Sequence, residues 1–225
     1  MVKSRSLLYK DLVVDAVLGT IKGIPFEIHN GEVEWFGGRS PWDESHAEPG
    51  GDAQDGEKKT VYVLLTKRVS VTSMILRLFL WDSYTHSSIA LEQEGPMYSF
   101  NPVQGFTVER PIGKKRPDVS CKLYQIEVSP QAFSELEARI RWFEAHPGEY
   151  KFNYLGLVLT ILRIPVGIGN RYYCSQFIST LLSNTEATEL RKRPNHYLPA
   201  YFKREKDIKL TFKGEIGDLN ARDTE

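Results

Sequence analysis

The chain has few cysteines, no net charge and no long apolar run. Its 225 residues include only Cys121 and Cys174, too few for a disulfide framework. Lys and Arg total 29, and Asp and Glu also total 29, so overall charge gives no attraction to nucleic acid or to an anionic membrane. No apolar run reaches the roughly 20 residues of a membrane span, and the first residues do not form the apolar core of a secretory signal. We therefore expect a cytoplasmic protein with free thiols, no integral membrane segment and no nucleic-acid partner.

The composition changes twice in the first quarter of the chain. Residues 37–59 are rich in glycine, proline and acidic residues and nearly empty of aliphatic ones, which predicts a flexible linker. Residues 1–36 then form an N-terminal appendage, with a helix over 7–21 and a hairpin over 26–36 that turns at Asn30-Gly31. Residues 60–225 are predicted to form the main domain.

The main domain is predicted to mix short strands with helices. Apolar runs and alternation predict strands over 61–65, 85–92, 96–101 and 122–128, the middle two forming a β-hairpin. Helices are predicted over 71–80, from Pro130 after an N-cap at Ser129 to about Pro147, over 152–162, and from Cys174 to about Ser183. The segment 152–162 is apolar all round and predicts a buried helix, followed by a loop over 164–170. These elements together indicate the α+β class.

Cys174 is the candidate nucleophile. Cys174, Phe177, Ile178 and Leu181 fall at i, i+3, i+4 and i+7, which places the thiol at the first turn of a helix. Unpaired N–H groups and the helix dipole at that position lower the pKa of a thiol. The N–H groups of Cys174 and Ser175 would also bind an oxyanion, and the hydroxyl of Tyr173 would add a further donor.

His86 is the candidate base among five histidines. His46 lies in the linker, His146 at a helix end, and His29 and His196 in segments expected to face solvent. His86 instead opens a strand in which its own face carries the small residues Ser88 and Ala90, which leave room beside the imidazole. A cysteine nucleophile needs such a base within hydrogen-bond reach.

A third polar group is expected to orient the imidazole. The neighbouring strand offers Ser99 and Asn101 on one face, and we favour Ser99, with Asn101 as the alternative. Glu109 is a further acidic candidate whose placement the sequence leaves open.

Several segments in this order resemble the circularly permuted papain-like hydrolases of the NlpC type. They are Val61-Tyr-Val-Leu-Leu-Thr66, Tyr84-Thr-His-Ser-Ser-Ile-Ala90, Met97-Tyr-Ser-Phe100, Asn153-Tyr-Leu-Gly156 and Tyr172-Tyr-Cys-Ser-Gln-Phe177. The resemblance implies an antiparallel sheet packed against the nucleophile helix, and acyl chemistry on an amide or thioester without a cofactor. It further implies that Cys174 attacks, His86 shuttles the proton and a polar residue on the next strand steadies His86. A neutral residue in that third place departs from the commoner pattern and puts catalytic power in doubt.

Three functions follow as hypotheses. The first is a hydrolase for an amide bond in a peptide, an isopeptide or a cell-wall muropeptide. The second is acyl transfer on a lipid, as in proteins similar to lecithin:retinol acyltransferase, for which the apolar residues Leu76, Leu78, Phe79 and Trp81 would suit an acyl chain. The third is a binding module without useful catalysis. Gly167-Ile-Gly169 lacks the rest of a phosphate loop, the basic residues between 191 and 206 indicate a solvated surface, and no Cys/His spacing predicts a zinc site.

Overall fold

The computed structural model describes residues 26–29, 32–35, 57–67, 84–109, 117–164 and 166–222. Of residues 26–29, 32–35, 166–168 and 220–222 it describes the backbone alone. The helices predicted over 7–21 and 71–80, and most of the predicted linker, lie outside the described residues. The boundaries proposed for the appendage, linker and main domain therefore stay predictions.

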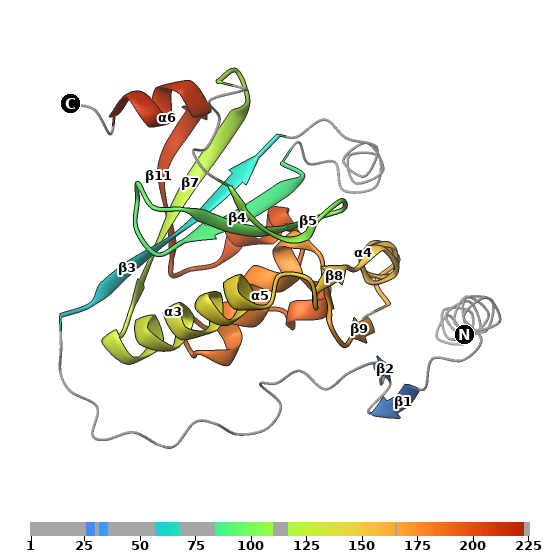
Figure 1. Cartoon of the computed structure of the whole chain (residues 1–225). Helices are drawn as coiled ribbons and strands as arrows, with labels where there is room; N and C mark the ends of the chain where they lie inside the picture. Colours follow the sequence, from blue (N-terminus) through green and yellow to red (C-terminus); the bar gives the residue numbers. More distant parts are fainter. Residues whose placement is uncertain are drawn as a thin grey trace, which may run out of the picture.

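A six-stranded antiparallel sheet forms the centre of the fold (Figure 1). Its strands, in spatial order, are β11 (Ile208–Glu215), β7 (Ser120–Val128), β3 (Lys59–Thr66), β4 (His86–Ala90), β5 (Met97–Asn101) and β6 (Gly105–Glu109). The four strands predicted from the sequence are confirmed, including the hairpin of β4 and β5. The two outer strands, β6 and β11, were not predicted.

The two faces of this sheet carry separate apolar clusters, because successive side chains of a strand point to opposite faces. On one face, strand residues such as Val61 and Val63 pack with α3 (Pro130–Ala145) and α5 (Cys174–Asn184). On the other, Leu64 and Leu123 pack with Phe212 and with α6 (Ile216–Arg222). Figure 1 shows α3 and α5 side by side under the sheet and α6 at the far end of β11.

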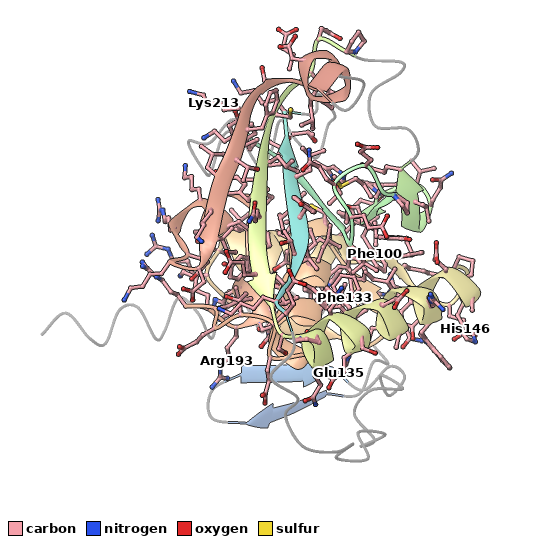
Figure 2. All side chains as sticks on the ribbon, turned by 90° about the vertical axis from the view of Figure 1, so that its left-hand side faces the viewer. Phe100, Phe133, Glu135, His146, Arg193 and Lys213 are labelled. Atoms are coloured by element: carbon pink, nitrogen blue, oxygen red, sulfur yellow. The ribbon has the colours of Figure 1, made fainter. Side chains whose placement is uncertain are left out.

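Aromatic rings fill the layer between the sheet and the two long helices. Phe100 is fully buried, and its ring centroid lies 5.0 Å from that of Phe177 and 6.0 Å from that of Phe143. In Figure 2, Phe100 lies inside the molecule, whereas Lys213 and Arg193 lie at its periphery. This cluster stabilises the packing of β5 against α3 and α5, since aromatic pairs at these distances contribute beyond the area they bury.

The local sequence explains where α3 begins. Ser129 has an extended backbone, and its hydroxyl accepts a hydrogen bond from the Ala132 N–H at 3.1 Å. Pro130 follows at the first helical position, where its missing N–H costs nothing. The predicted N-cap, the helix and its buried stripe of Leu136, Ile140 and Phe143 are confirmed.

A second, smaller sheet joins the N-terminal hairpin to the segment before α5. Its strands, in spatial order, are β1 (Phe26–His29), β2 (Glu32–Trp35), β9 (Val166–Ile168), β10 (Arg171–Tyr172) and β8 (Lys151–Phe152). The predicted hairpin is confirmed as β1 and β2, and β2 pairs in parallel with β9. The loop predicted over 164–170 thus contains a strand, which the local pattern did not show because its partner lies near the opposite end of the chain.

The helix α4 (Tyr154–Ile161) is not buried on all sides, so the prediction for 152–162 is partly wrong. Its inward face holds Gly156, Leu157, Leu159 and Thr160. Tyr154, Val158 and Leu162 keep 54%, 47% and 42% of their surface exposed. An apolar composition therefore did not lead to complete burial here.

Two short 3-10 helices, η1 (Pro194–His196) and η2 (Pro199–Arg204), connect α5 to β11. Within the described part of the chain, no helix combines the length and the apolar character that crossing a bilayer requires. The fold is thus of the α+β class, with an antiparallel sheet and a few helices.

Candidate active site

Cys174 is the first residue of α5, as predicted, and 7% of its surface is exposed. Tyr173 precedes it as the N-cap with an extended backbone, φ −99° and ψ 163°. Phe177, Ile178 and Leu181 on the same helix are buried in the core and fix its position. The thiol therefore sits at a helix N-terminus, where the first N–H groups have no partner within the helix.

His86 lies at the start of β4 and reaches Cys174. Its ring lies near enough to the Cys174 sulfur to influence the pKa of the thiol, and 7% of the residue is exposed. The structure thus brings together the nucleophile and the base that were predicted from segments 88 residues apart in the sequence.

Opposing influences act on the Cys174 thiol. Burial is the largest single influence and alone would raise its pKa. The neighbouring His86 ring, through hydrogen bonding and positive charge, acts together with Ser87 to outweigh burial and lower the pKa of Cys174 below its ordinary value. The site therefore favours the thiolate, the nucleophilic form of cysteine.

Ser87 supports the sulfur from β4. Its backbone and its hydroxyl both contribute to lowering the pKa of Cys174. The hydroxyl is fully buried and has no hydrogen-bond partner among the described residues. It is therefore available to stabilise negative charge on the sulfur.

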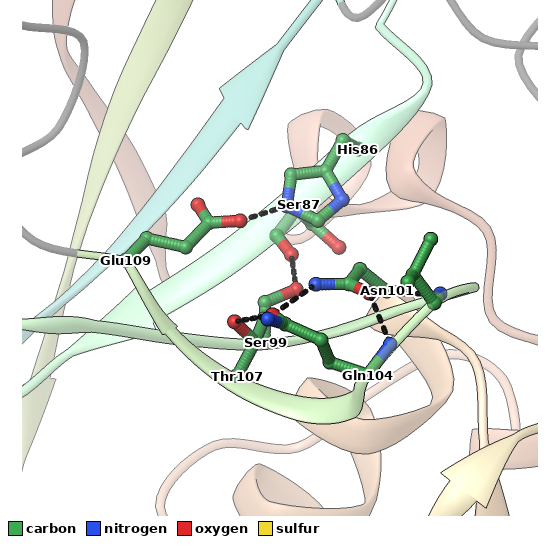
Figure 3. A network of polar contacts seen from close by, with 8 residues as sticks. His86, Ser87, Ser99, Asn101, Gln104, Thr107 and Glu109 are labelled. Atoms are coloured by element: carbon green, nitrogen blue, oxygen red, sulfur yellow. Dashed lines mark hydrogen bonds and ion pairs between the residues drawn. The ribbon is translucent and has the colours of Figure 1, made fainter.

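Glu109 holds the other side of the imidazole. It is the last residue of β6, and its Oε1 lies 3.0 Å from Nε2 of His86 (Figure 3). The two side chains are 14% and 8% exposed, so water screens the pair weakly. When Glu109 is ionised, its Oε1 can only accept, so the proton of this hydrogen bond then belongs to Nε2 of His86. Glu109 thus has the geometry of the orienting third group.

Ser99 and Asn101, the residues favoured from the sequence for this role, bind elsewhere. The buried Ser99 hydroxyl donates to the Ser87 carbonyl oxygen at 2.6 Å, as Figure 3 shows. Asn101 Oδ1 accepts from the N–H groups of Val103 and Gln104 at 2.9 and 2.8 Å, which stabilises the turn between β5 and β6. Glu109 was left unplaced because β6 was not predicted. The run Gly105-Phe-Thr-Val-Glu109 contains aromatic and β-branched residues, a signal from which this strand could have been predicted.

Tyr173 and Ser175, predicted as oxyanion or substrate contacts, have side chains that bind inside the protein. The fully buried Tyr173 hydroxyl donates to the Asn195 carbonyl at 3.1 Å, and burial raises its pKa. The Ser175 hydroxyl donates to the Tyr197 carbonyl at 2.7 Å. The Tyr173 hydroxyl is therefore engaged inside the protein, whereas the prediction for Ser175 concerned its backbone N–H and stays a prediction.

Asn153 links the starts of α4 and α5. Its Oδ1 accepts from the Gly156 N–H at 2.8 Å, and its Nδ2 donates to Gln176 Oε1 at 3.2 Å. A Cβ on Gly156 would lie 2.2 Å from Asn153 Nδ2, so a larger residue at this place in α4 would displace the Asn153 side chain. The segment Asn153-Tyr-Leu-Gly156 therefore braces the first turn of the nucleophile helix.

The assembled groups are a buried thiol of lowered pKa, an imidazole between thiol and carboxylate, and a helix N-terminus. This arrangement can carry out nucleophilic attack and proton transfer on an acyl group. Among the residues that the structure describes, no group of three or more His, Cys, Asp or Glu side chains is arranged to hold a metal ion. In comparisons with known proteins, no protein-family model matches the chain and no curated protein sequence matches it significantly.

Proposed function

We propose that this chain is a cysteine-dependent acyl hydrolase with the layout of the circularly permuted papain-like, NlpC-type enzymes. The observation that carries the proposal is the position of His86 between the Cys174 sulfur and the Glu109 carboxylate. The order along the chain supports it too, because the histidine strand precedes the cysteine helix. An acidic third residue brings the site closer to the commoner pattern than the neutral Ser99 would have done.

The reaction begins when the Cys174 thiolate attacks the carbonyl carbon of the substrate. A sulfur–carbon bond forms, and the N–H groups at the start of α5 stabilise the negative oxygen. Collapse of this intermediate breaks the bond to the leaving nitrogen or oxygen, which takes the proton from the His86 imidazolium. The product of this half is a thioester on Cys174.

Water completes the cycle. Neutral His86 takes a proton from a water molecule, whose oxygen attacks the thioester carbonyl. The sulfur–carbon bond breaks, the acid leaves, and the thiolate and imidazolium are restored. Glu109 holds Nε2 throughout and stabilises the ring when it is charged.

The first substrate class is an amide, in a peptide, an isopeptide or a muropeptide. A thiolate of this kind suits a reducing compartment, so we retain the cytoplasm as the proposed location. The second candidate is an acyl lipid, which the exposed apolar side chains of α4 favour. No cofactor enters either reaction.

Two measurements test the proposal. Iodoacetamide at neutral pH should label Cys174 much faster than Cys121, whose thiol is fully buried with a pKa raised to about 11, chiefly by burial. His86→Ala should slow labelling of Cys174 and leave Cys121 unchanged. Equal and slow labelling of both thiols would instead favour the binding module.

The second measurement follows the thioester. Incubation with a small activated ester such as p-nitrophenyl acetate, followed by an acid quench, should add one acyl group to the wild-type chain. The Cys174→Ala variant should gain none. Loss of catalysis without loss of fold in this variant assigns the thioester to Cys174, whereas equal acylation of both proteins contradicts the mechanism.

A further inference from the structure

An exposed apolar face runs along α4. Tyr154, Val158 and Leu162 lie at i, i+4 and i+8 and share one side of the helix. They keep 54%, 47% and 42% of their surface exposed, and the helix has no charged residue. Scattered exposed apolar residues are ordinary on a protein surface, but a row of three on one helix face indicates a contact surface.

The turn between β5 and β6 extends this face. Val103 in that turn is 92% exposed, and the Tyr154 hydroxyl donates to the neighbouring Pro102 carbonyl at 2.8 Å. Gly105 holds the turn against β8, since its φ is +75° and a Cβ there would lie 2.2 Å from the Tyr150 carbonyl oxygen. Val103, Tyr154, Val158 and Leu162 therefore form one surface, here called the α4 face.

Basic residues accompany the α4 face. Residues 151–185 contain Lys151, Arg163 and Arg171 and no Asp or Glu, although the whole chain is neutral. All three are exposed, and Lys151 and Arg171 are partners in the pairing of β8 with β10. Arg163 directly follows Leu162 and adopts a φ of 63°, a conformation that glycine or asparagine usually occupies at a helix end. This segment thus combines exposed apolar and exposed cationic side chains without an acidic one, a composition that suits anionic lipid surfaces.

The size of the face distinguishes a lipid from a protein partner. A stable protein interface buries about 800 Å² on each partner, more than four side chains supply. A bilayer interface needs only a few apolar side chains that enter the headgroup region, with cations beside them. The charge and the size both favour lipid.

The α4 face lies beside the nucleophile. Thr160, on the inward side of α4, is 3.1 Å from the Tyr173 hydroxyl, and Asn153 at the start of α4 binds Gln176 in the first turn of α5. A surface bound to α4 is therefore close to the end of α5 that carries Cys174.

We propose that the α4 face docks on the surface of an anionic bilayer and that the substrate is an acyl lipid drawn from it. The docking stands on the exposed apolar row and its basic neighbours. The identity of the substrate rests in addition on the proposed function.

Vesicle co-sedimentation of the full chain tests the docking. Wild type should bind vesicles of mixed phosphatidylcholine and phosphatidylserine, more weakly as salt is added, and pure phosphatidylcholine vesicles much less. Val158→Glu should weaken binding roughly tenfold, because it removes apolar burial and adds a like charge. The matched control is Leu210→Glu on β11, where the leucine is 50% exposed and the same change should leave binding unaltered.

A second variant tests the charges. Changing Lys151, Arg163 and Arg171 together to Gln should weaken binding to anionic vesicles by roughly 100-fold, about fivefold for each side chain. Binding to neutral vesicles should not change. Thermal unfolding of each variant, compared with that of Leu210→Glu, confirms that the fold is intact.

The result that overturns docking is wild-type binding that is absent or is equal to that of Val158→Glu. A dimer that Val158→Glu dissociates, without vesicle binding, also overturns it by assigning the face to a second copy of the chain. Cys174→Ala separates the two proposals, because it should dock like wild type. If wild type docks but phosphatidylcholine and phosphatidylserine form no thioester on Cys174, the acyl-lipid substrate is refuted. Acylation of the same protein by p-nitrophenyl acetate would still support the hydrolase proposal.

Discussion

Replacing Glu109 with glutamine isolates the role of charge in orienting His86. The amide has nearly the shape of the carboxylate and can still accept from Nε2 across the 3.0 Å contact, but its negative charge is gone. The imidazolium then loses its charged partner in a site where water screens weakly. The thiolate–imidazolium pair becomes less stable, so the pKa of Cys174 rises.

The magnitude follows from the kind of bond that is lost. A hydrogen bond to a charged group contributes about 1.5–3 kcal/mol and a neutral one about 1 kcal/mol. The substitution therefore removes about 0.5–2 kcal/mol of stabilisation from the charged pair. Since about 1.4 kcal/mol is a factor of ten, the thiolate population below the pKa, and with it alkylation, should fall roughly tenfold.

The assay is the rate of iodoacetamide labelling of Cys174 as a function of pH, read by peptide mass. The sign is fixed by the lowered pKa: thiolate is present above it and lost as pH falls, so Glu109→Gln moves the profile to higher pH. Cys121 serves as an internal control in every sample. Glu127→Gln is the matched variant, because Glu127 is also a strand acid with a cationic partner, Lys209 at 3.1 Å, but both of their side chains are exposed to solvent.

One result would refute the reasoning. If the Glu109→Gln profile superimposes on that of wild type while His86→Ala displaces it, Glu109 does not act on the ring. An equal displacement in Glu127→Gln would point to a general effect of charge instead.

Three further predictions concern groups around the site. Ser99→Ala should lower the free energy of unfolding by about 1 kcal/mol, measured in urea, through loss of a buried hydrogen bond. The pH dependence of Cys174 labelling should not change in this variant. A shift to higher pH like that of Glu109→Gln would instead assign the orienting role to Ser99. Cys121 should destabilise the fold in alkali, because its thiol, with a pKa raised to about 11, ionises more readily when unfolded. The stability that the protonated Cys121 thiol contributes is present below the pKa of the unfolded state and is lost as pH rises above it. Wild type should therefore lose about 2 kcal/mol more stability than Cys121→Ala between pH 8 and about pH 10.5. Equal losses in the two proteins would contradict this prediction. Gly156→Ala should displace Asn153 and slow labelling of Cys174 severalfold with the helix content retained in circular dichroism, whereas an unchanged rate would show that the brace does not reach the thiol.

The sequence predicted the parts of the site that local patterns determine. Cys174 was found because helical spacing is a property of a few successive residues, and His86 because a strand start with small neighbours stood out among five histidines. The strands and helices with strong periodicity were found for the same reason.

The parts that depend on distant contacts were not found. Glu109 reaches His86 only because β6 folds back on β5, and the sequence alone gave no register for that strand. The exposed side of α4 was missed because an all-apolar helix looks the same whether or not its outer face has a neighbour. Both depend on tertiary packing rather than on propensity.

The pairing of β2 with β9 has a consequence for the order of folding. Val33 and Val166 are partners in this parallel ladder, so most of the chain must be synthesised before β2 can meet its neighbour. Contacts of such long sequence separation form slowly, because loop closure costs entropy before the contact compensates for it. The N-terminal hairpin is therefore expected to join the sheet late. Refolding followed at the β9–β10 edge, which leads directly into Cys174, should lag behind the formation of α3 and the central strands.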